Sequence, residues 1–180
     1  MTATHVIDPA TSALLVIDFQ ARLMPVIHEA EAVMANARRL LDAAALFGIP
    51  TLFTEQNAKG LGGTVPDLAP PPELVAHKMS FDACRAPGFL DRLPGGRALV
   101  VAGCEAHVCV LQTVLGLLAH GRRVYLVTDA IASRRPASRD TGIRRMERHG
   151  AEPVTTEMVI FEWLQTAEHP RFREGIDLIR

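Results

Sequence analysis

Cysteine is scarce in this chain, and so is any surplus of charge of one sign. Three cysteines occur among 180 residues, and an odd number without a secretory leader predicts reduced thiols in the cytoplasm. The N-terminal segment lacks a basic region and its apolar run is broken by Asp18, so we expect no signal peptide. The formal net charge of −1 gives no reason to expect nucleic acid or an anionic membrane as a partner.

Long hydrophobic runs, internal repeats and low-complexity tracts are also missing. No stretch approaches the roughly 18 to 20 uninterrupted apolar residues that a membrane span needs. Hydrophobic residues make up 48% of the chain and charged residues 22%, a balance typical of globular proteins. We therefore expect a single domain over residues 1–180, with a core at about 12–165 and a C-terminal tail at 166–180.

Apolar runs and helical stripes alternate along the sequence. Runs typical of buried parallel strands are expected at 13–18, 51–55, 74–80, 98–103, 124–129 and 153–154. Helices are expected at 29–47, 89–93, 107–120, 138–149 and 157–166, and a glycine- and proline-rich loop at 57–75. This alternation predicts right-handed crossovers and hence an α/β fold. We expect one doubly wound, Rossmann-like sheet of about six mostly parallel strands, with helices on both faces.

Three reactive side chains stand at the carboxyl ends of different expected strands. Asp18 ends the first, Lys78 ends the third, and Cys109 begins the helix after the fourth. Ligands of open α/β sheets bind beyond these strand ends, so the three side chains can reach one another. A helix N-terminus and an ammonium group stabilise a thiolate, and a carboxylate can accept its proton. Asp18, Lys78 and Cys109 would therefore form a coherent base, charge stabiliser and nucleophile.

Further residues at the same edge are candidates for a substrate pocket. The four that follow the first two strands are Phe19, Gln20, Glu55 and Gln56. A purely structural role in the loops explains these four equally well. His107 is expected to face the pocket or an adjacent subunit.

Three segments resemble the sequence blocks of the isochorismatase-like cysteine hydrolases. They read LLVIDFQ (14–20), HKMSFDAC (77–84) and GCEAHVCVLQTV (103–114), in the order found in that family. The resemblance extends from about Ser12 to Leu164. It is strongest to the subgroup of isochorismatase domain-containing proteins and bacterial octameric hydrolases. That subgroup also carries segments similar to TEQ (54–56), KGLG (59–62) and SRR (133–135).

This resemblance implies a role for each residue of the expected site. Asp18 would be the general base, Lys78 the stabiliser of the thiolate, and Cys109 the nucleophile. It also implies a cis peptide bond between Cys104 and Glu105, which would aim the backbone N–H groups of Glu105 and Cys109 at the oxyanion of a tetrahedral intermediate. The implied activity is hydrolysis of C–N bonds in small, non-peptide, amide-like or other acyl substrates through a cysteine thioester.

No metal or cofactor is expected. Metal-binding members of the family carry a histidine after the second strand, and here no histidine occurs between His28 and His77. Members that cleave the vinyl ether of isochorismate lack the cysteine, so its presence favours acyl chemistry. The expected partners are a small-molecule substrate and other copies of the chain, as a dimer or larger homo-oligomer.

Other interpretations stay open. A cysteine after a buried strand often packs as a small hydrophobe, the role we assign to Cys104, and Cys84 is taken as an inert thiol. A metal site at Cys104 and Cys109 would match no zinc-ligand spacing. The fold would also suit a catalytically silent oligomeric protein, or a thiol-redox protein that uses Cys104 with Cys109. The six arginines of residues 133–150 are interpreted as a solvated helix face, because no aromatic residue accompanies them.

Overall fold

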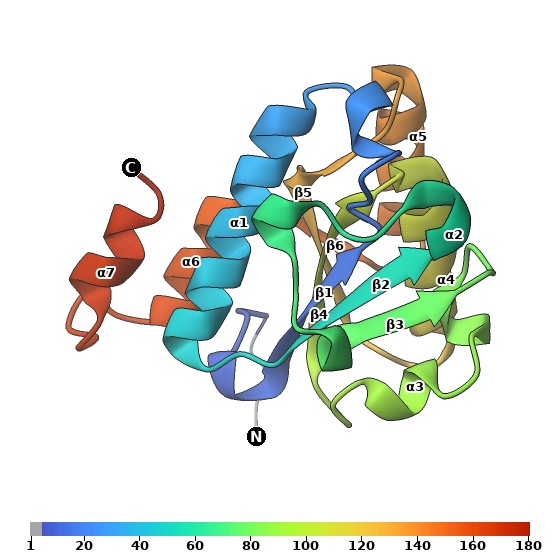
Figure 1. Ribbon diagram of the computed structural model, residues 1–180. Coiled ribbons are helices and arrows are strands. Elements are labelled where there is room, and N and C mark those ends of the chain that lie inside the picture. The colour runs from blue at the N-terminus through green and yellow to red at the C-terminus, as the bar shows by residue number, and fades with distance from the viewer. Residues whose placement is uncertain (1–4) are drawn as a thin grey trace.

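Six parallel strands form the centre of the computed structural model, which describes residues 5–180. They are β1 (Ser12–Ile17), β2 (Thr51–Gln56), β3 (Val75–Lys78), β4 (Ala98–Cys104), β5 (Val124–Ala132) and β6 (Glu152–Val154). Their order in the sheet is β3-β2-β1-β4-β5-β6, so the winding reverses between β1 and β4 (Figure 1). This is the doubly wound α/β sheet that the alternating sequence pattern predicts, and it is parallel throughout.

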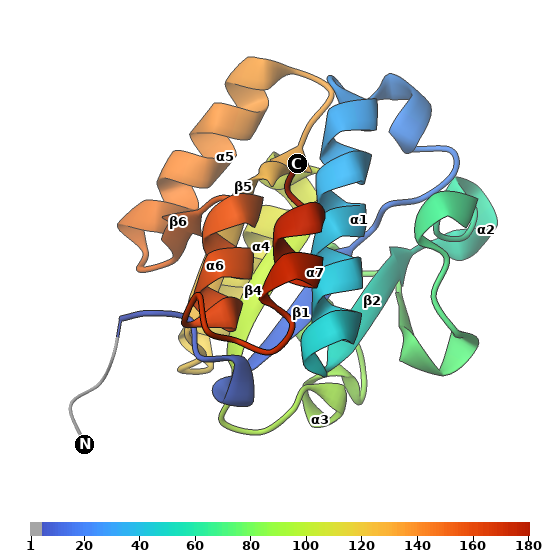
Figure 2. The same ribbon diagram turned by 90° about the vertical axis from the view of Figure 1, so that its left-hand side faces the viewer.

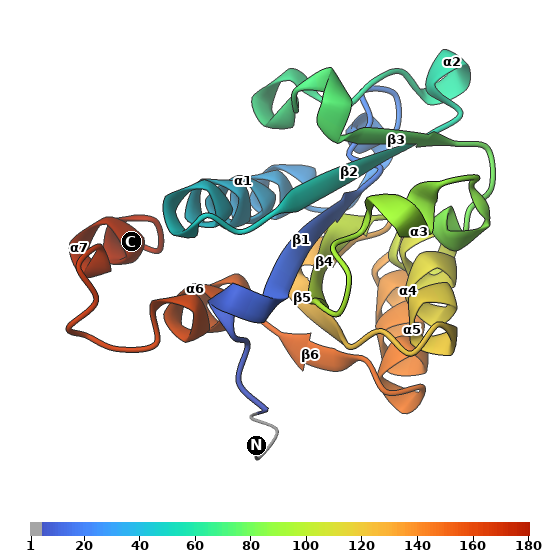
Figure 3. The same ribbon diagram turned by 90° about the horizontal axis from the view of Figure 1, so that it is seen from below.

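Helices cover both faces of this sheet. They are α1 (Ala30–Phe47), α2 (Ala58–Leu61), α3 (Phe89–Arg92), α4 (Leu111–Ala119), α5 (Pro136–Arg148), α6 (Thr156–Leu164) and α7 (Phe172–Asp177). Seen from below, α1 and α6 lie on one side of the strands, while α3, α4 and α5 lie on the other (Figure 3). Within residues 5–180, every helix is too short or too polar to span a bilayer.

Each face of the sheet has its own hydrophobic core, and β1 contributes to both. Leu14 and Val16 point into the core under α1 and α6, whereas Leu15 and Ile17 point into the core under α4. This follows from the two-residue period of a strand, which sends successive side chains to opposite faces. Because both faces are covered, all six residues of β1 are buried, as its continuous apolar run predicts.

The C-terminal tail folds back onto its own chain. In Figure 2, α7 lies in front of the sheet alongside α1 and α6. Phe172 and Ile176 pack against the core on that side, and Arg39 Nε donates a hydrogen bond of 3.0 Å to the carbonyl oxygen of Leu178. The apolar face of the tail is therefore covered within the chain itself.

The clearest departures from the expected boundaries occur in three segments. β5 continues to Ala132 rather than ending at 129, and its pairing with β4 shifts register between Val101 and Gly103. The helix expected from residue 107 begins one residue earlier as a π-helical turn, Ala106–Val110, before α4. The loop at 57–75 contains α2 and two short 3-10 turns, Pro66–Leu68 and Pro72–Leu74, each begun by a proline whose fixed φ suits a helical start.

Candidate active site

Asp18, Lys78 and Cys109 meet at the carboxyl edge of the sheet, beside the point where the winding reverses. Asp18 follows β1, Lys78 is the last residue of β3, and Cys109 lies in the π-helical turn after β4. Asp18 adopts a φ of +52°, a left-handed conformation in which side chains other than glycine, asparagine and aspartate are rare. Single π-helical turns within helices are frequent at functional sites.

The carboxylate of Asp18 is fully engaged inside the protein. Lys78 Nζ donates a hydrogen bond of 2.7 Å to Asp18 Oδ2, and both side chains are only 1% exposed. Thr54 Oγ1 donates a second bond, of 2.6 Å, to Asp18 Oδ1. A buried ion pair is tolerated when such additional bonds satisfy its oxygens, because each ion has lost its hydration. The pair therefore stands preformed at the end of the sheet.

The thiol of Cys109 lies beside this ion pair and is 7% exposed. Burial and the negative charge of Asp18 raise the pKa of Cys109 to about 12, although Lys78 acts in the opposite direction. Asp18 and Lys78 are thus the two charged side chains that act most strongly on the pKa of this thiol. The sulfur is therefore a neutral thiol near neutral pH, and the Asp18 carboxylate is close to it.

The turn that carries Cys109 begins with the expected cis peptide bond, between Cys104 and Glu105. The carbonyl oxygen of Glu105 accepts hydrogen bonds from the backbone N–H groups of Val108 (3.0 Å) and Val110 (3.2 Å), which close the turn. The use of the Glu105 and Cys109 N–H groups as oxyanion donors stays a prediction.

The side chain of Glu105 fastens this turn to the loop after β5. Its carboxylate accepts hydrogen bonds from the backbone N–H (3.0 Å) and Nε (2.9 Å) of Arg134. Burial raises the pKa of Glu105, but these bonds outweigh that effect and hold the pKa below its usual value. A second link joins His107 Nδ1 to Ser133 Oγ at 3.0 Å. His107 is thus held by the loop, and its expected place in a substrate pocket stays a prediction.

Helix α5 approaches the same turn unusually closely. A Cβ atom added to Gly142 would lie 2.8 Å from the carbonyl oxygen of Ala106 and 3.1 Å from the Cα atom of His107. Glycine at this position therefore lets the helix pack directly against the turn that carries Cys109.

Phe19, Gln20 and Gln56, all expected in the pocket, belong to the framework around it. Phe19 is buried in the core under α1 and α6. Gln20 is also buried. Its Nε2 donates to the carbonyl oxygens of Gln56 (3.0 Å) and Gly62 (2.6 Å), and its Oε1 accepts from the N–H of Gln56 (2.9 Å). These bonds attach the loop after β2 to the end of β1.

Glu55 has a similar role further along the loop. Its Oε1 accepts hydrogen bonds from the N–H (2.7 Å) and Oγ1 (2.8 Å) of Thr64, and its Oε2 lies 3.4 Å from His77 Nδ1. These contacts give a structural role to Phe19, Gln20, Glu55 and Gln56, which is the alternative that the sequence left equally open. Their contact with a substrate stays a prediction.

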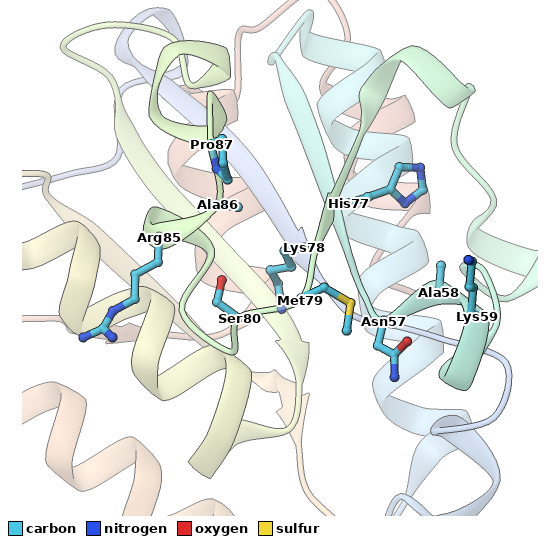
Figure 4. A pocket seen from close by; sticks show the side chains of 10 residues that line it. All are labelled: Asn57, Ala58, Lys59, His77, Lys78, Met79, Ser80, Arg85, Ala86 and Pro87. Atoms are coloured by element: carbon cyan, nitrogen blue, oxygen red, sulfur yellow. The ribbon is translucent and has the colours of Figure 1, made fainter.

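A cavity of about 680 Å³ opens beside Lys78, within the size range of small-molecule sites. Figure 4 shows its lining, which comprises Asn57, Ala58, Lys59, His77, Lys78, Met79, Ser80, Arg85, Ala86 and Pro87. Apart from Lys78, none of these was among the expected site residues. Their signal in the sequence is positional, because the segments directly after β2 and β3 must meet at one edge of the sheet.

Thr54 and Arg134 are the other side chains of the site that sequence reasoning did not single out. No local sequence pattern indicates their partners, because each partner is distant in the chain. Thr54 bonds to Asp18, 36 residues away, and Arg134 bonds to Glu105, 29 residues away. For metal binding, no group of three histidine, cysteine, aspartate or glutamate side chains within residues 5–180 is arranged to hold an ion.

Comparison with known proteins supplies the family. Residues 12–158 match the isochorismatase domain. The chain belongs to the isochorismatase family. Isochorismatase domain-containing protein 1 of Salmo salar is 37% identical over 175 residues, which cover 96% of this chain and 62% of that protein. The chain thus spans about three-fifths of the length of that relative.

Two solved structures of isochorismatase-like fold are closely similar. One, described as the MAR1 ribonuclease of Caenorhabditis elegans, has 38% identity and a TM-score of 0.89, with 97% of this chain and 92% of that chain covered. The other is the YcaC gene product of Escherichia coli, described as an octameric hydrolase of unknown specificity. It has 26% identity and a TM-score of 0.88, with 99% and 91% covered. Family membership therefore assigns this chain a hydrolase-type fold.

Proposed function

We propose that this isochorismatase family member is a cysteine hydrolase that cleaves the C–N bond of a small amide-like or other acyl substrate at Cys109. The observation that carries this proposal is the Asp18–Lys78 pair. It is buried, Lys78 Nζ lies 2.7 Å from Asp18 Oδ2, and the charges of both members act on the pKa of the neighbouring Cys109 thiol. A base, a cation and a nucleophile in mutual contact at a strand edge are the parts that acyl transfer needs.

The first half of the reaction forms a thioester. Cys109 Sγ attacks the acyl carbon while its proton passes to Asp18. The proton leaves during the attack because the raised pKa of the thiol keeps it protonated beforehand. The backbone N–H groups of Glu105 and Cys109 would stabilise the oxyanion. The C–N bond then breaks, and Asp18 returns the proton to the leaving amine. Lys78 stays protonated throughout and stabilises whichever neighbour carries the negative charge.

The second half releases the acid. Asp18 accepts a proton from water as the water oxygen attacks the thioester carbon. The C–S bond breaks, and the sulfur recovers its proton from Asp18. Every proton that leaves Cys109 or water thus has Asp18 as its acceptor.

The decisive experiment screens wild-type protein and the Cys109→Ala variant against small amides, ureido acids and hydroxamates. We expect wild type to hydrolyse at least one class and Cys109→Ala to have no detectable turnover while its circular dichroism and thermal midpoint stay native. Cys84→Ala is the matched control and should retain activity, because Cys84 lies outside the ion-pair contacts. Full activity of Cys109→Ala would overturn the proposal.

A redox function of Cys104 with Cys109 is disfavoured by their positions. Cys104 is buried in the core under α1 and α6, whereas Cys109 belongs to the core under α4, on the opposite face of the sheet. Mass spectrometry after mild peroxide treatment tests this alternative, and a bridge between the two sulfurs would support it. Single-stranded RNA belongs in the same screen because of the C. elegans neighbour. The cavity of about 680 Å³ and the near-neutral chain favour a small molecule instead.

The proposal includes a homo-oligomer and a reducing compartment such as the cytoplasm. The oligomer is supported by the YcaC structure, which is described as octameric, and the compartment by the three free cysteines. Light scattering coupled to size-exclusion chromatography measures the first point. A monomeric mass at micromolar concentration would contradict it.

A further inference from the structure

The cavity beside Lys78 is lined by cations and uncharged groups, with no carboxylate among the lining residues. Two of its cations are already paired. Lys78 is bound to Asp18 at 2.7 Å, and Arg85 lies 3.5 Å from Asp82. Lys59 differs, because no ion pair or side-chain hydrogen bond joins it to any other residue of the range 5–180. Its ammonium group is therefore the cation of the lining that remains available to a ligand.

Two other donors lie on the same side of the cavity as Lys59. In Figure 4, Asn57, Lys59 and His77 occupy one side of the view, Lys78 and Met79 the centre, and Arg85 the opposite side. The backbone explains this grouping, since the N–H of Asn57 donates a 2.8 Å hydrogen bond to the carbonyl oxygen of Lys78 at the paired ends of β2 and β3.

The nearby carboxylate of Glu55 does not line the cavity, and its oxygens have partners of their own. Its Oε1 is occupied by the backbone N–H and hydroxyl of Thr64, and its Oε2 lies beside His77 Nδ1. With Nδ1 directed at this carboxylate, His77 Nε2 donates to a ligand only when both ring nitrogens are protonated. The donors at this side of the cavity are therefore an ammonium and an amide, joined by the imidazolium form of His77, a set that suits a carboxylate.

We infer that the cavity recognises the carboxylate of an anionic substrate, with Lys59 as the specificity-determining cation and Asn57 and His77 as additional donors. This inference rests on the proposed hydrolase function, which it narrows to small carboxylic acids that carry an amide or other acyl group at the opposite end. In this placement the carboxylate lies at Lys59 and the apolar body crosses Met79. Cys109 is not among the lining residues, so the placement requires the acyl group to extend beyond the cavity, past Lys78, to the nucleophile.

The test compares three ω-amide carboxylates with neutral amides of equal carbon count. The pairs are succinamate with butanamide, glutaramate with pentanamide, and adipamate with hexanamide. For at least one pair we expect wild type to show the higher kcat/KM on the carboxylate. Lys59→Met should lower that value on the order of 10-fold, as loss of a charged hydrogen bond would, and leave the neutral amide unchanged. Lys59→Arg should retain most of the preference.

Arg85→Met is the matched control, because Arg85 lines the opposite side of the same cavity. It should change kcat/KM for the carboxylates less than 2-fold, since Arg85 is exposed and already paired with Asp82. A loss in Arg85→Met that equals or exceeds the loss in Lys59→Met would overturn the assignment to Lys59. If wild type has equal kcat/KM for the carboxylate and the neutral amide in all three pairs, the whole inference is overturned.

Binding to the inactive Cys109→Ala variant separates this inference from the hydrolase proposal. For at least one of the three pairs, we expect an NMR titration to show tighter binding of the carboxylate than of the neutral amide. That carboxylate should bind more weakly to Cys109→Ala/Lys59→Met. If wild type hydrolyses no amide but this binding preference is present, the hydrolase proposal fails and the anion site stands. If amides are hydrolysed but both members of every pair bind equally, the anion site fails and the hydrolase stands.

Discussion

Two ion pairs flank the proposed nucleophile, and they differ in exposure and in what they hold. Asp18 and Lys78 are both 1% exposed, and their charges shift the pKa of the neighbouring Cys109 thiol. Glu105 is 8% exposed but its partner Arg134 is 57% exposed, and the bonds between them fix a backbone turn. The buried pair is the part suited to proton transfer, because its charges are not screened by water. The outer pair is suited to holding the turn that presents the sulfur.

The largest expected effect comes from removing one charge of the buried pair. Lys78→Met leaves the Asp18 carboxylate buried without its cation, and we expect the free energy of unfolding to fall by about 3–5 kcal/mol and turnover to be lost. Urea unfolding followed by circular dichroism measures the stability. The double variant Asp18→Asn/Lys78→Met should recover part of it, since no unpaired charge remains. If Lys78→Met loses no more unfolding free energy than Asp18→Asn/Lys78→Met, the pair is not buried as described.

The two regions should also respond to opposite ends of the pH scale. The pKa of Cys109 is raised from 9.0 to about 12, so the protonated thiol stabilises the fold below pH 9 and this contribution is lost as the pH rises towards 12. The pKa of Glu105 is lowered from 4.5, so its contribution is present above that value and is lost as the pH falls below it.

Unfolding measured from pH 3 to pH 11 distinguishes these contributions. Cys109→Ala should lose less stability than wild type above pH 9, and Glu105→Gln should lose less below pH 4.5. Cys109→Ala should still lose some stability at alkaline pH, because burial also raises the pKa values of Cys84 and Cys104. If stability depends on pH in the same way for wild type and both variants, Cys109 and Glu105 do not make these contributions.

The smallest change in stability is expected at the exposed partner of the outer pair. Arg134→Ala should leave the thermal midpoint almost unchanged, because exposed ion pairs add little stability. Its kcat should nevertheless fall by about 2- to 10-fold, since the turn that presents Cys109 is held less firmly. Arg135→Ala is the matched control, as the neighbouring exposed arginine makes no contact with Glu105. Equal kcat values for Arg134→Ala and Arg135→Ala would show that Arg134 does not position the turn.

The main elements of the fold, and the positions of Asp18, Lys78 and Cys109 at strand ends or just after them, were predictable from the sequence because their signals are local. Each strand of the sheet is an apolar run, and the reactive side chains follow directly at the strand ends. Thr54 and Arg134 were not predictable as partners, since each contact spans about 30 residues and depends on which strands become neighbours. The expected pocket residues Gln20 and Glu55 have polar side chains that a loop could use as well as a ligand, and sequence alone could not separate the two.

What the sequence determined by itself is the succession of the main helices and strands and the chemistry available at the strand ends. These depend on residues a few positions apart, through the periods of helix and strand. Only the tertiary structure decided the strand order β3-β2-β1-β4. This order brings Asp18 and Lys78, 60 residues apart, within hydrogen-bond distance and places the turn after β4, which carries Cys109, beside them. It also decided that Asn57, Lys59 and His77 share one side of a cavity. Those outcomes depend on long-range pairing and packing, which no local pattern encodes.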